Sequence, residues 1–284
     1  MPELPDLEVI CEYLRPRLLG AEVAAVQIRR PIIVRDLIGE PLAGRRFTDV
    51  TRRGKFLLMA LDGNVTMVLN PMLAGRLRYG EPLARDRVRD AVVILLTDGL
   101  ELRYHDAADM GKLYLTGDPE RVPGFAGMGP EANDPDLTLE RFHVRLRRFR
   151  GEIKGVLTDQ AFVAGIGNAY SDEICWSARI YPFRRRADLS ANEIAVLYEA
   201  MRAVLAEATA TLRVRVGSAI EVEIRDFLAV HGKVGQPCPR CGSTISRVSL
   251  ARSSTDFCRT CQPGLMIERR RGTKRPGSQT QDGR

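Results

Sequence analysis

The sequence lacks two features that would direct a chain into a membrane or out of the cell. No apolar run is long enough to span a bilayer, and the start has no basic stretch followed by an apolar one. Cysteine is also scarce: there are six residues in 284, and four of them lie close together near the end. Such usage is typical of a reducing compartment rather than of a disulfide-bonded secreted protein. We therefore expect a cytoplasmic protein with no membrane partner.

The chain does contain enough apolar sequence for folded domains, together with an excess of basic charge. Hydrophobic residues make up 44% and charged residues 28%, and the length suggests about two domains plus a small module. The net charge of +7 favours a polyanionic partner, although excess basic charge is often only a solvated surface. Clustering strengthens the first interpretation, because one short stretch contains Arg141, Arg145, Arg147, Arg148, Arg150 and Lys154.

The opening residues, Met1-Pro2-Glu3-Leu4-Pro5-Asp6, allow two interpretations. One is simply an amphipathic helix, since a proline suits the first helical turn and apolar residues follow at helical spacing up to Leu18. The other is chemical. Initiator methionine is normally removed before a small residue, and removal would leave Pro2 as a secondary amine next to the carboxylate of Glu3. When such an amine attacks a sugar C1′, the resulting iminium ion is an electron sink that promotes β-elimination.

Along the body of the chain, the spacing of apolar residues changes once, from a strand pattern to a helical one. Residues 21–116 read as strands, with examples at 55–61, 64–69, 91–97 and 100–105 separated by Asp-Gly turns. We expect a β-sandwich with the first helix packed on it. A stretch rich in proline and glycine, 118–136, reads as a connection. From Thr138 the period is helical, and Ser190 with Glu193 forms a capping box ahead of another apolar stripe.

A glycine-rich turn precedes one of these helices. The segment Ala164-Gly165-Ile166-Gly167-Asn168-Ala169-Tyr170 leads into a helical run expected over 171–178. Backbone N–H groups exposed at such a helix N-terminus can bind a phosphate. A simple helix–helix turn would use glycine for backbone reasons alone, and the turn by itself does not separate the two interpretations.

The most specific local pattern is a pair of Cys-x2-Cys knuckles, Cys238/Cys241 and Cys258/Cys261. Their spacing predicts one structural Zn²⁺ ion per chain, bound tetrahedrally by four thiolates. No ligand position is left open, so we expect the ion to serve folding rather than chemistry. The segment between the knuckles is a candidate β-hairpin that can contact DNA.

In this order, the motifs resemble the formamidopyrimidine-DNA glycosylase / endonuclease VIII family. The resemblance covers residues 1 to about 262 and includes Arg53-Gly54-Lys55-Phe56-Leu57. It implies an α+β multidomain protein that acts as a monomer on damaged double-stranded DNA in the cytoplasm, associated with the nucleoid. The implied division is 1–117, an N-terminal catalytic β-sandwich with a packed helix; 118–136, a linker; 137–232, a helix–two-turn–helix DNA-binding domain; 233–262, a zinc finger; and 263–284, a basic disordered tail.

The resemblance also implies an activity. Members of this family are bifunctional DNA glycosylases and AP lyases of base excision repair, which excise oxidised bases from duplex DNA and then cut the abasic strand. At the matching positions, Pro2 resembles the Schiff-base nucleophile and Glu3 the general acid that opens the sugar ring. Lys55 matches a strand-borne lysine that contacts a phosphate and assists elimination.

Further positions carry implied DNA contacts. Lys154 and Asn168 match phosphate-gripping residues, and Leu73 aligns with the apolar side chain that fills the void left by the flipped base. Glu173 falls on a carboxylate of the helix–two-turn–helix motif. The finger arginine that completes δ-elimination aligns with Ser253, while Arg252 is one residue away; whether δ-elimination follows is left open.

The sequence departs from the family where 8-oxoguanine-removing members carry two arginines and a phenylalanine. Here those positions are Ala108, Asp109 and Met110. Without a guanidinium to read the orphaned base, we expect weak discrimination between bases opposite the lesion. Asp109 should also lower DNA affinity unless it is turned away. The stretch 217–232 is shorter than the family's lesion-capping loop. We therefore expect greater activity on abasic sites, oxidised pyrimidines and ring-opened purines than on 8-oxoguanine.

Two other classes of protein remain open at this point. One is a degenerate family member that binds damaged or abasic DNA without excising bases; the missing arginines favour it, whereas Pro2, Glu3 and Lys55 argue against it. The other is a metal-binding structural or regulatory DNA protein, in which the N-terminus only begins a helix.

Overall fold

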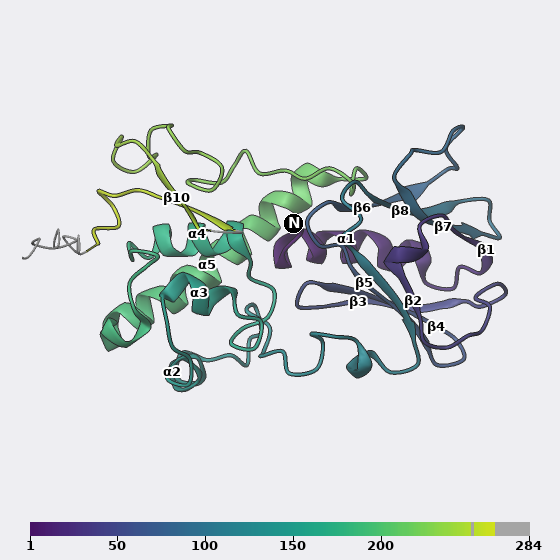
Figure 1. Ribbon diagram of the computed structural model, residues 1–284, viewed down its shortest axis with the longest axis horizontal. Helices are drawn as coiled ribbons and strands as arrows, with labels where there is room; N and C mark the ends of the chain where they lie inside the picture. Colours follow the sequence, from purple (N-terminus) through teal and green to yellow (C-terminus); the bar gives the residue numbers. More distant parts are fainter. Residues whose placement is uncertain (251–252, 265–284) are drawn as a thin grey trace, which may run out of the picture.

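The first part of the chain forms two stacked β-sheets with a helix along their side (Figure 1). The computed structural model describes residues 1–250 and 253–264, so most of the predicted tail and Arg252 lie outside the described residues. The four-stranded antiparallel sheet has the order β1 (Val23–Ile28), β7 (Asp90–Leu96), β8 (Glu101–Asp106), β6 (Gly75–Gly80). The five-stranded sheet has the order β2 (Val34–Asp36), β9 (Lys112–Thr116), β5 (Val65–Asn70), β4 (Phe56–Leu61), β3 (Phe47–Arg53), with β2 parallel to β9.

Helix α1 (Leu4–Leu18) covers the side of the sandwich where the edge strands β3 and β6 lie. Tyr13 of α1 packs edge-on against Tyr79 of β6. On its other side, Cys11 donates its thiol to the carbonyl of Val50 in β3. Buried side chains from α1 and both sheets form one apolar core. The helix thereby protects two strand edges that would otherwise present unpaired backbone groups.

The strands predicted at 55–61, 64–69, 91–97 and 100–105 are confirmed, each within one residue, as β4, β5, β7 and β8. The exception that matters for function is Lys55, which was expected on a strand but lies in the turn between β3 and β4. Gly54 adopts a φ of 55°, a left-handed conformation that favours glycine. The chain therefore turns at Gly54 and Lys55, and β4 begins at Phe56.

The second part of the chain is helical and surrounds a core of its own. It contains α2 (Leu139–Leu146), α3 (Ile153–Thr158), α4 (Asn168–Ser177) and the long α5 (Ala191–Val216). Short 3₁₀ turns lie at Pro31–Ile33 in the sandwich and at Pro119–Arg121 and Arg186–Asp188 farther along the chain. The predicted capping box is present at the start of α5, where the N–H of Glu193 donates to Ser190 Oγ and the N–H of Ser190 donates to the Glu193 carboxylate. A hairpin of β10 (Ser246–Leu250) and β11 (Ser253–Phe257) follows in the finger.

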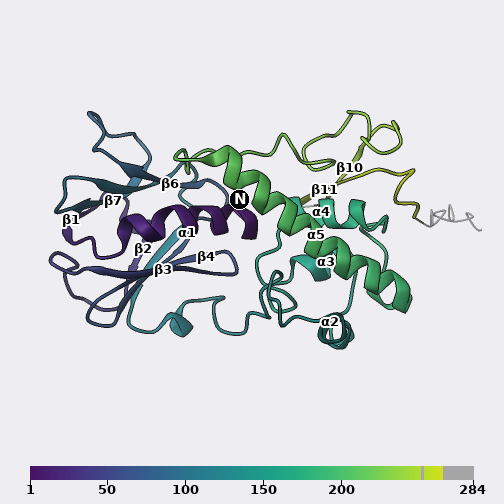
Figure 2. The same ribbon diagram turned by 180° about the vertical axis from the view of Figure 1, so that it is seen from behind.

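Each part of the chain contributes the end of one helix to the apolar core of the other part. Leu4, at the start of α1, is buried in the helical core, whereas Leu212 and Val216, at the end of α5, are buried in the sandwich core. Figure 2 shows α5 crossing from one body to the other beside α1. This exchange brings the N-terminus to the junction of the two bodies. The predicted α+β architecture is confirmed, and no helix among residues 1–250 and 253–264 is long and apolar enough to cross a membrane.

Candidate active site and DNA-binding surface

Pro2 lies buried at the junction of the two bodies, immediately before α1. The backbone N–H of Leu4 donates to the carbonyl of Gly165 at 2.9 Å, which ties the start of the chain to the glycine-rich turn. Glu3 is the N-cap of α1, and its own N–H donates to Asp6 Oδ2 at 2.8 Å. The segment is therefore both a capped helix and a precisely anchored N-terminus, so the two interpretations of the sequence are compatible.

The carboxylate of Glu3 caps a second helix as well. It accepts hydrogen bonds from the backbone N–H groups of Gly167 at 2.6 Å, Ala169 at 2.9 Å and Tyr170 at 3.3 Å, and the residue is only 2% exposed. These are the groups at the start of α4 that we expected to bind a phosphate. In the structure they bind Glu3 instead, since a carboxylate also suits the positive end of a helix dipole. Any phosphate contact there falls to Asn168, the first residue of α4, which is half-buried.

Lys55 reaches the same point from the β3–β4 turn. A Cβ atom added at Gly167 would lie 2.6 Å from Glu3 Oε1 and 2.7 Å from Lys55 Nζ. Glycine is therefore required at 167, because a side chain there would collide with both Glu3 and Lys55. Burial lowers the pKa of the Lys55 ammonium from its ordinary value, and the neighbouring carboxylate of Glu3 offsets part of that effect.

The turn that carries Lys55 is held by a residue that sequence reasoning missed. Glu131, in the connection between the two bodies, accepts from the N–H of Gly54 at 2.6 Å and from Arg53 at 2.7 Å, and it also pairs with Arg52. Three donors converge on one carboxylate, so the position of the turn is tightly specified. The Arg53-Gly54 dipeptide gave no local signal of this partner, which lies 77 residues from Gly54.

The stretch 217–232 folds back onto the N-terminus. Glu223 Oε1 lies 3.4 Å from the terminal amine of Met1 and also pairs with Arg76 of β6. Arg225 binds Asp6 of α1 at 2.6 Å and the hydroxyl of Tyr170 in α4 at 2.8 Å. This stretch therefore borders the candidate active site.

Of the predicted DNA contacts, Leu73 is the best placed. It is 57% exposed at the tip of the β5–β6 loop, directly after Met72, whose φ of 49° turns the backbone sharply. Lys154 differs from the expectation of a phosphate-gripping residue. Its ammonium donates to Asp172 Oδ1 at 2.6 Å, to the carbonyl of Ser254 at 2.9 Å and to Thr255 Oγ1 at 2.9 Å. All three protons are thus used within the protein, where they join α3 to α4 and the finger hairpin.

Asp109 is turned away from solvent rather than presented as a free negative charge. Its Oδ2 atom accepts from Arg89 at 2.8 Å and also binds Arg30. The residue takes a φ of 55°, which aspartate tolerates better than most side chains. Met110, beside it, is 44% exposed. The loss of DNA affinity that a bare carboxylate would cause is therefore not expected.

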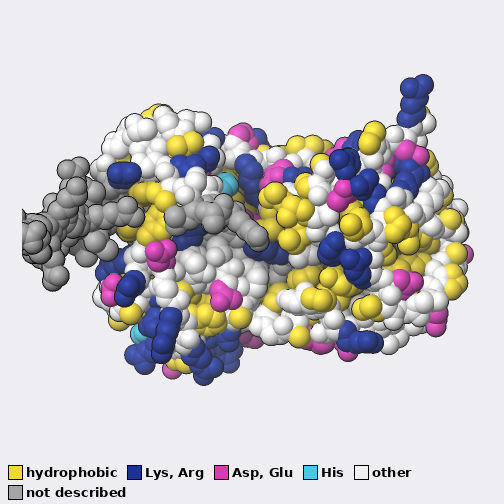
Figure 3. Space-filling model, in the orientation of Figure 1, with side chains coloured by type: hydrophobic (Ala, Val, Ile, Leu, Met, Phe, Trp, Pro, Cys, Tyr) yellow, Lys and Arg dark blue, Asp and Glu magenta, His cyan; other side chains and the backbone are white. Residues whose placement is uncertain are grey.

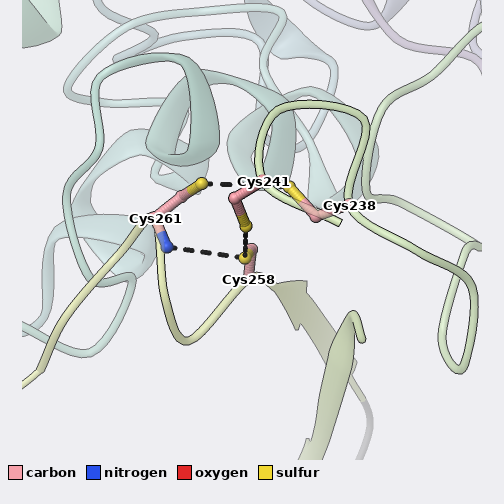
Figure 4. A group of neighbouring side chains, drawn as sticks. All are labelled: Cys238, Cys241, Cys258 and Cys261. Carbon is pink, nitrogen blue, oxygen red and sulfur yellow. Dashed lines mark hydrogen bonds between the residues drawn. The ribbon is translucent and has the colours of Figure 1, made fainter. Parts of the chain in front are cut away.

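The finger places its four cysteines around one point (Figure 4). The Sγ atoms of Cys241 and Cys258 lie 3.4 Å apart, those of Cys238 and Cys261 3.9 Å apart, and all four ligand atoms lie within 4.8 Å of one another. A tetrahedral site with Zn–S bonds of about 2.3 Å requires sulfur atoms about 3.8 Å apart. The cysteines therefore fit a structural Zn²⁺ ion.

Buried charge attaches the finger to the helical body. Asp172 accepts from Lys154 and lies 2.8 Å from His231 Nδ1, while Asp256 of β11 pairs with both nitrogens of the Arg247 fork at 2.6 and 2.7 Å. Asp172, His231 and Asp256 could geometrically hold a metal ion. However, both carboxylates already have cationic partners, so this group is better described as an ion-pair network.

Glu173 repeats the arrangement seen at Glu3. Its buried carboxylate accepts from three consecutive backbone N–H groups, at Ala229, Val230 and His231, over 2.8 to 2.9 Å. Burial raises the pKa of Glu173 above its ordinary value, even though these three bonds act in the opposite direction. Glu173 thereby fixes the segment that leads from α5 into the finger.

Three parts of the chain match known protein families. Residues 1–113 match the formamidopyrimidine-DNA glycosylase N-terminal domain, 128–218 the formamidopyrimidine-DNA glycosylase H2TH domain, and 235–264 a zinc finger found in FPG and IleRS. The chain belongs to the formamidopyrimidine-DNA glycosylase family. Its finger is a structural zinc site.

Individual relatives match over almost the whole chain. The formamidopyrimidine-DNA glycosylase of Herpetosiphon aurantiacus is 36% identical over 275 residues, covering 92% of this chain and all of the relative. That of Moorella thermoacetica is 38% identical, with coverages of 87% and 94%. Among solved structures, Lactococcus lactis Fpg with abasic-site DNA superposes with a TM-score of 0.83 at 27% identity, covering 92% and 100%. MutM from Thermus thermophilus gives 0.80 at 34%, covering 92% and 98%.

Proposed function

We propose that the chain is a bifunctional DNA glycosylase and AP lyase of base excision repair, acting as a monomer on damaged duplex DNA. The observation that carries the proposal is that the side chains of Glu3 and Lys55 both closely approach Gly167, while Pro2 immediately precedes Glu3 in the chain. Once Met1 is removed, the secondary amine of Pro2, the carboxylate of Glu3 and the Lys55 amine of lowered pKa would supply a nucleophile and two proton-transfer groups. Its substrate and its sparse cysteine favour the cytoplasm, in association with the nucleoid.

The reaction begins after Met1 is removed. The nitrogen of Pro2 attacks C1′ of the flipped nucleotide, and the base leaves with a proton as the glycosidic bond breaks. Glu3 protonates the sugar ring oxygen, so the ring opens to an iminium ion on Pro2. Loss of a C2′ proton then expels the 3′ phosphate, and hydrolysis of the iminium ion releases the enzyme. The lowered pKa of Lys55, which burial causes, supports a role for its amine in proton transfer during elimination.

DNA is bound chiefly through its phosphates, which makes affinity dependent on salt. Figure 3 shows Lys and Arg side chains gathered over the region of α2, where Arg147, Arg148 and Arg150 are exposed. Asn168 contributes at the start of α4. Leu73 enters the base stack in place of the flipped nucleotide, a role that an apolar side chain of any shape can fill.

The choice of lesion follows from the residues that differ from the family. Ala108 and Met110 offer no paired hydrogen bonds to an orphaned base, so selectivity for the opposite base is weak. Activity on abasic sites, oxidised pyrimidines and ring-opened purines exceeds activity on 8-oxoguanine.

Borohydride trapping on abasic duplex DNA tests the proposed chemistry. The protein with a free N-terminus is expected to form a covalent complex, whereas an uncleaved N-terminal tag should abolish it because the Pro2 nitrogen is then an amide. A tagged protein that still cuts abasic DNA at the normal rate would remove Pro2 from the mechanism. A protein that binds abasic DNA but never traps would instead be a degenerate member, an alternative that the retained Pro2, Glu3 and Lys55 disfavour.

A further inference from the structure

Met1 occupies the space that the sugar enters in the proposed reaction. Its carbonyl carbon is bonded to the nitrogen of Pro2, the proposed nucleophile, until the methionine is removed. In the covalent intermediate, C1′ of the sugar is bonded to that same nitrogen. The side chains that contact Met1 in the structure are therefore those that face the sugar in the intermediate. Figure 1 shows this end of the chain at the junction of the two bodies, beside the start of α1.

The amide of Met1 and the iminium ion have the same shape. Both are planar about the Pro2 nitrogen, because each contains a C–N bond with double-bond character. The Met1–Pro2 peptide bond is trans, so Cα of Met1 lies on the side away from Cα of Pro2. The iminium carbon carries a hydrogen and C2′, and crowding places the larger group, C2′, on that same side. C2′ therefore corresponds to Cα of Met1, and the Met1 nitrogen corresponds to a substituent of C2′.

The Met1 nitrogen lies against the carboxylate of Glu223. Its distance to Glu223 Oε1 is 3.4 Å, and of the acidic side chains that the structure describes, only this one is within pairing distance of Met1. In the intermediate, the same carboxylate then faces C2′ and its hydrogens. Arg225 Nη2 lies 3.4 Å from the carbonyl oxygen of Met1, so the stretch 217–232 contacts both polar groups of this residue.

Two arginines hold the carboxylate of Glu223 in place. Arg76 of β6 pairs with Oε2, and Arg225 Nε lies 3.3 Å from Oε1. Burial acts to raise the pKa of Glu223, but the terminal amine and the two guanidinium groups outweigh it and hold the pKa below its ordinary value. The side chain is thus an ionised carboxylate that is able to accept a proton.

Two other carboxylates lie near the N-terminus, and both are tied to the starts of helices. Glu3 accepts three backbone N–H groups at the start of α4, and Asp6 accepts from the N–H of Glu3 and from Arg225. Among the described residues, Glu223 accepts only from side chains and from the terminal amine. The carboxylate available to C2′ is therefore that of Glu223.

We propose that Glu223 is the base that removes the C2′ proton in β-elimination. This inference rests on the proposed lyase function and assigns one of its steps. The C2′–H bond breaks, the proton goes to a carboxylate oxygen of Glu223, and the electron pair forms C1′=C2′ as the Pro2 nitrogen becomes neutral. The nitrogen lone pair then re-forms the iminium ion, the C1′=C2′ pair becomes C2′=C3′, and the 3′ phosphate leaves with the pair of the C3′–O bond.

The test compares two readouts on one abasic duplex, using protein that lacks Met1. Borohydride trapping reports the iminium ion, and strand cleavage reports elimination. Glu223→Ala should trap within a few-fold of the wild-type rate, because the nucleophile is untouched, and should cut about 10²–10⁴-fold more slowly, the typical contribution of a positioned proton-transfer group. Glu221→Ala is the matched control, because Glu221 lies in the same stretch and also pairs with an arginine, Arg87. It should trap and cut at wild-type rates.

Formate separates the role of a base from that of an anchor for the stretch 217–232. The change to alanine removes the carboxylate and leaves space that a small carboxylate fits. Formate added at constant ionic strength should therefore restore cutting by Glu223→Ala and leave the rates of wild type and Glu221→Ala unchanged. A side chain that only anchored the stretch would not be replaced by a free anion.

Three results would overturn the assignment of Glu223. They are an equal loss of trapping and cutting in Glu223→Ala, wild-type rates of both, and slow cutting that formate does not restore. None of these affects the proposed enzyme activity, as long as the wild-type protein traps and cuts. A wild-type protein that neither traps nor cuts abasic DNA would refute the proposed function, and the role of Glu223 with it.

Discussion

The pair Glu3→Gln and Glu173→Gln offers the sharpest test of the site, because the two carboxylates share the same kind of hydrogen-bond partners but lie at different positions. Each is buried, at 2% and 5% exposure, and each accepts three backbone N–H groups. Only Glu3 follows Pro2 in the chain and approaches Gly167 together with Lys55. A change that affects both residues equally therefore reports on the hydrogen bonds, and a change confined to Glu3 reports on the chemistry.

The expected loss of stability follows from the geometry. In either variant the amide NH2 replaces one acceptor oxygen, so at least one buried backbone N–H faces another donor. Leaving a buried donor unsatisfied costs about 1–3 kcal/mol. For a chain of this size each kcal/mol lowers the midpoint of thermal unfolding by about 2–4 °C. We expect both variants to unfold roughly 2–12 °C below wild type.

Single-turnover excision, measured at a temperature below the unfolding midpoints of both variants, then distinguishes the two variants. Glu173→Gln should retain excision within a few-fold of wild type, whereas Glu3→Gln should lose it by about 10²–10⁴-fold, the typical contribution of a general acid. Abasic-site trapping provides a second readout on the same samples.

Two results would refute this reasoning. Equal inactivation of both variants would show that the loss at Glu3 reflects a displaced α4 rather than proton transfer. Unchanged unfolding midpoints in both variants would show that the three-donor arrangement contributes nothing to stability.

Three further predictions concern other parts of the molecule. Removing zinc with a chelator should unfold the finger and change the fluorescence of Trp176, the only tryptophan. The reason is that the Nε1–H of Trp176 donates to Cys238 Sγ at 3.4 Å and the Arg240 guanidinium lies 3.9 Å from the centroid of its ring. Emission that does not change on metal loss would argue against this coupling. Because burial lowers the pKa of Lys55, the unfolded chain binds more protons than the folded one between the lowered pKa and the ordinary value of 10.5. Stability to thermal unfolding should thus rise with pH across that window, and Lys55→Met should remove this component of the rise. Excision of 8-oxoguanine opposite C and opposite A should proceed at similar rates and more slowly than removal of an oxidised pyrimidine; strong selectivity for C would mean that another residue reads the orphaned base.

The sequence alone determined the features that depend on residues close together in the chain. Apolar runs separated by Asp-Gly turns placed β4, β5, β7 and β8 within one residue, and the Ser190–Glu193 pair placed the start of α5. The two Cys-x2-Cys knuckles specified the zinc site, because a tetrahedral ion requires that ligand set regardless of what surrounds it. In each case the partners are close in the chain, or the chemistry permits one arrangement.

Only the tertiary structure decided which groups share a hydrogen-bond partner across long separations. The sequence predicted a phosphate site at the turn before α4. In the structure, Glu3, which is more than 160 residues away in the chain, accepts hydrogen bonds from the N–H groups of that turn. Lys154 read as a phosphate contact, yet burial against Asp172 and the finger hairpin uses all three of its protons. A donor or acceptor shows its type in the sequence, whereas its partner depends on which elements pack together. That packing depends on α1 and α5, each of which buries side chains in both cores. The local spacing of apolar residues in the sequence does not reveal this arrangement.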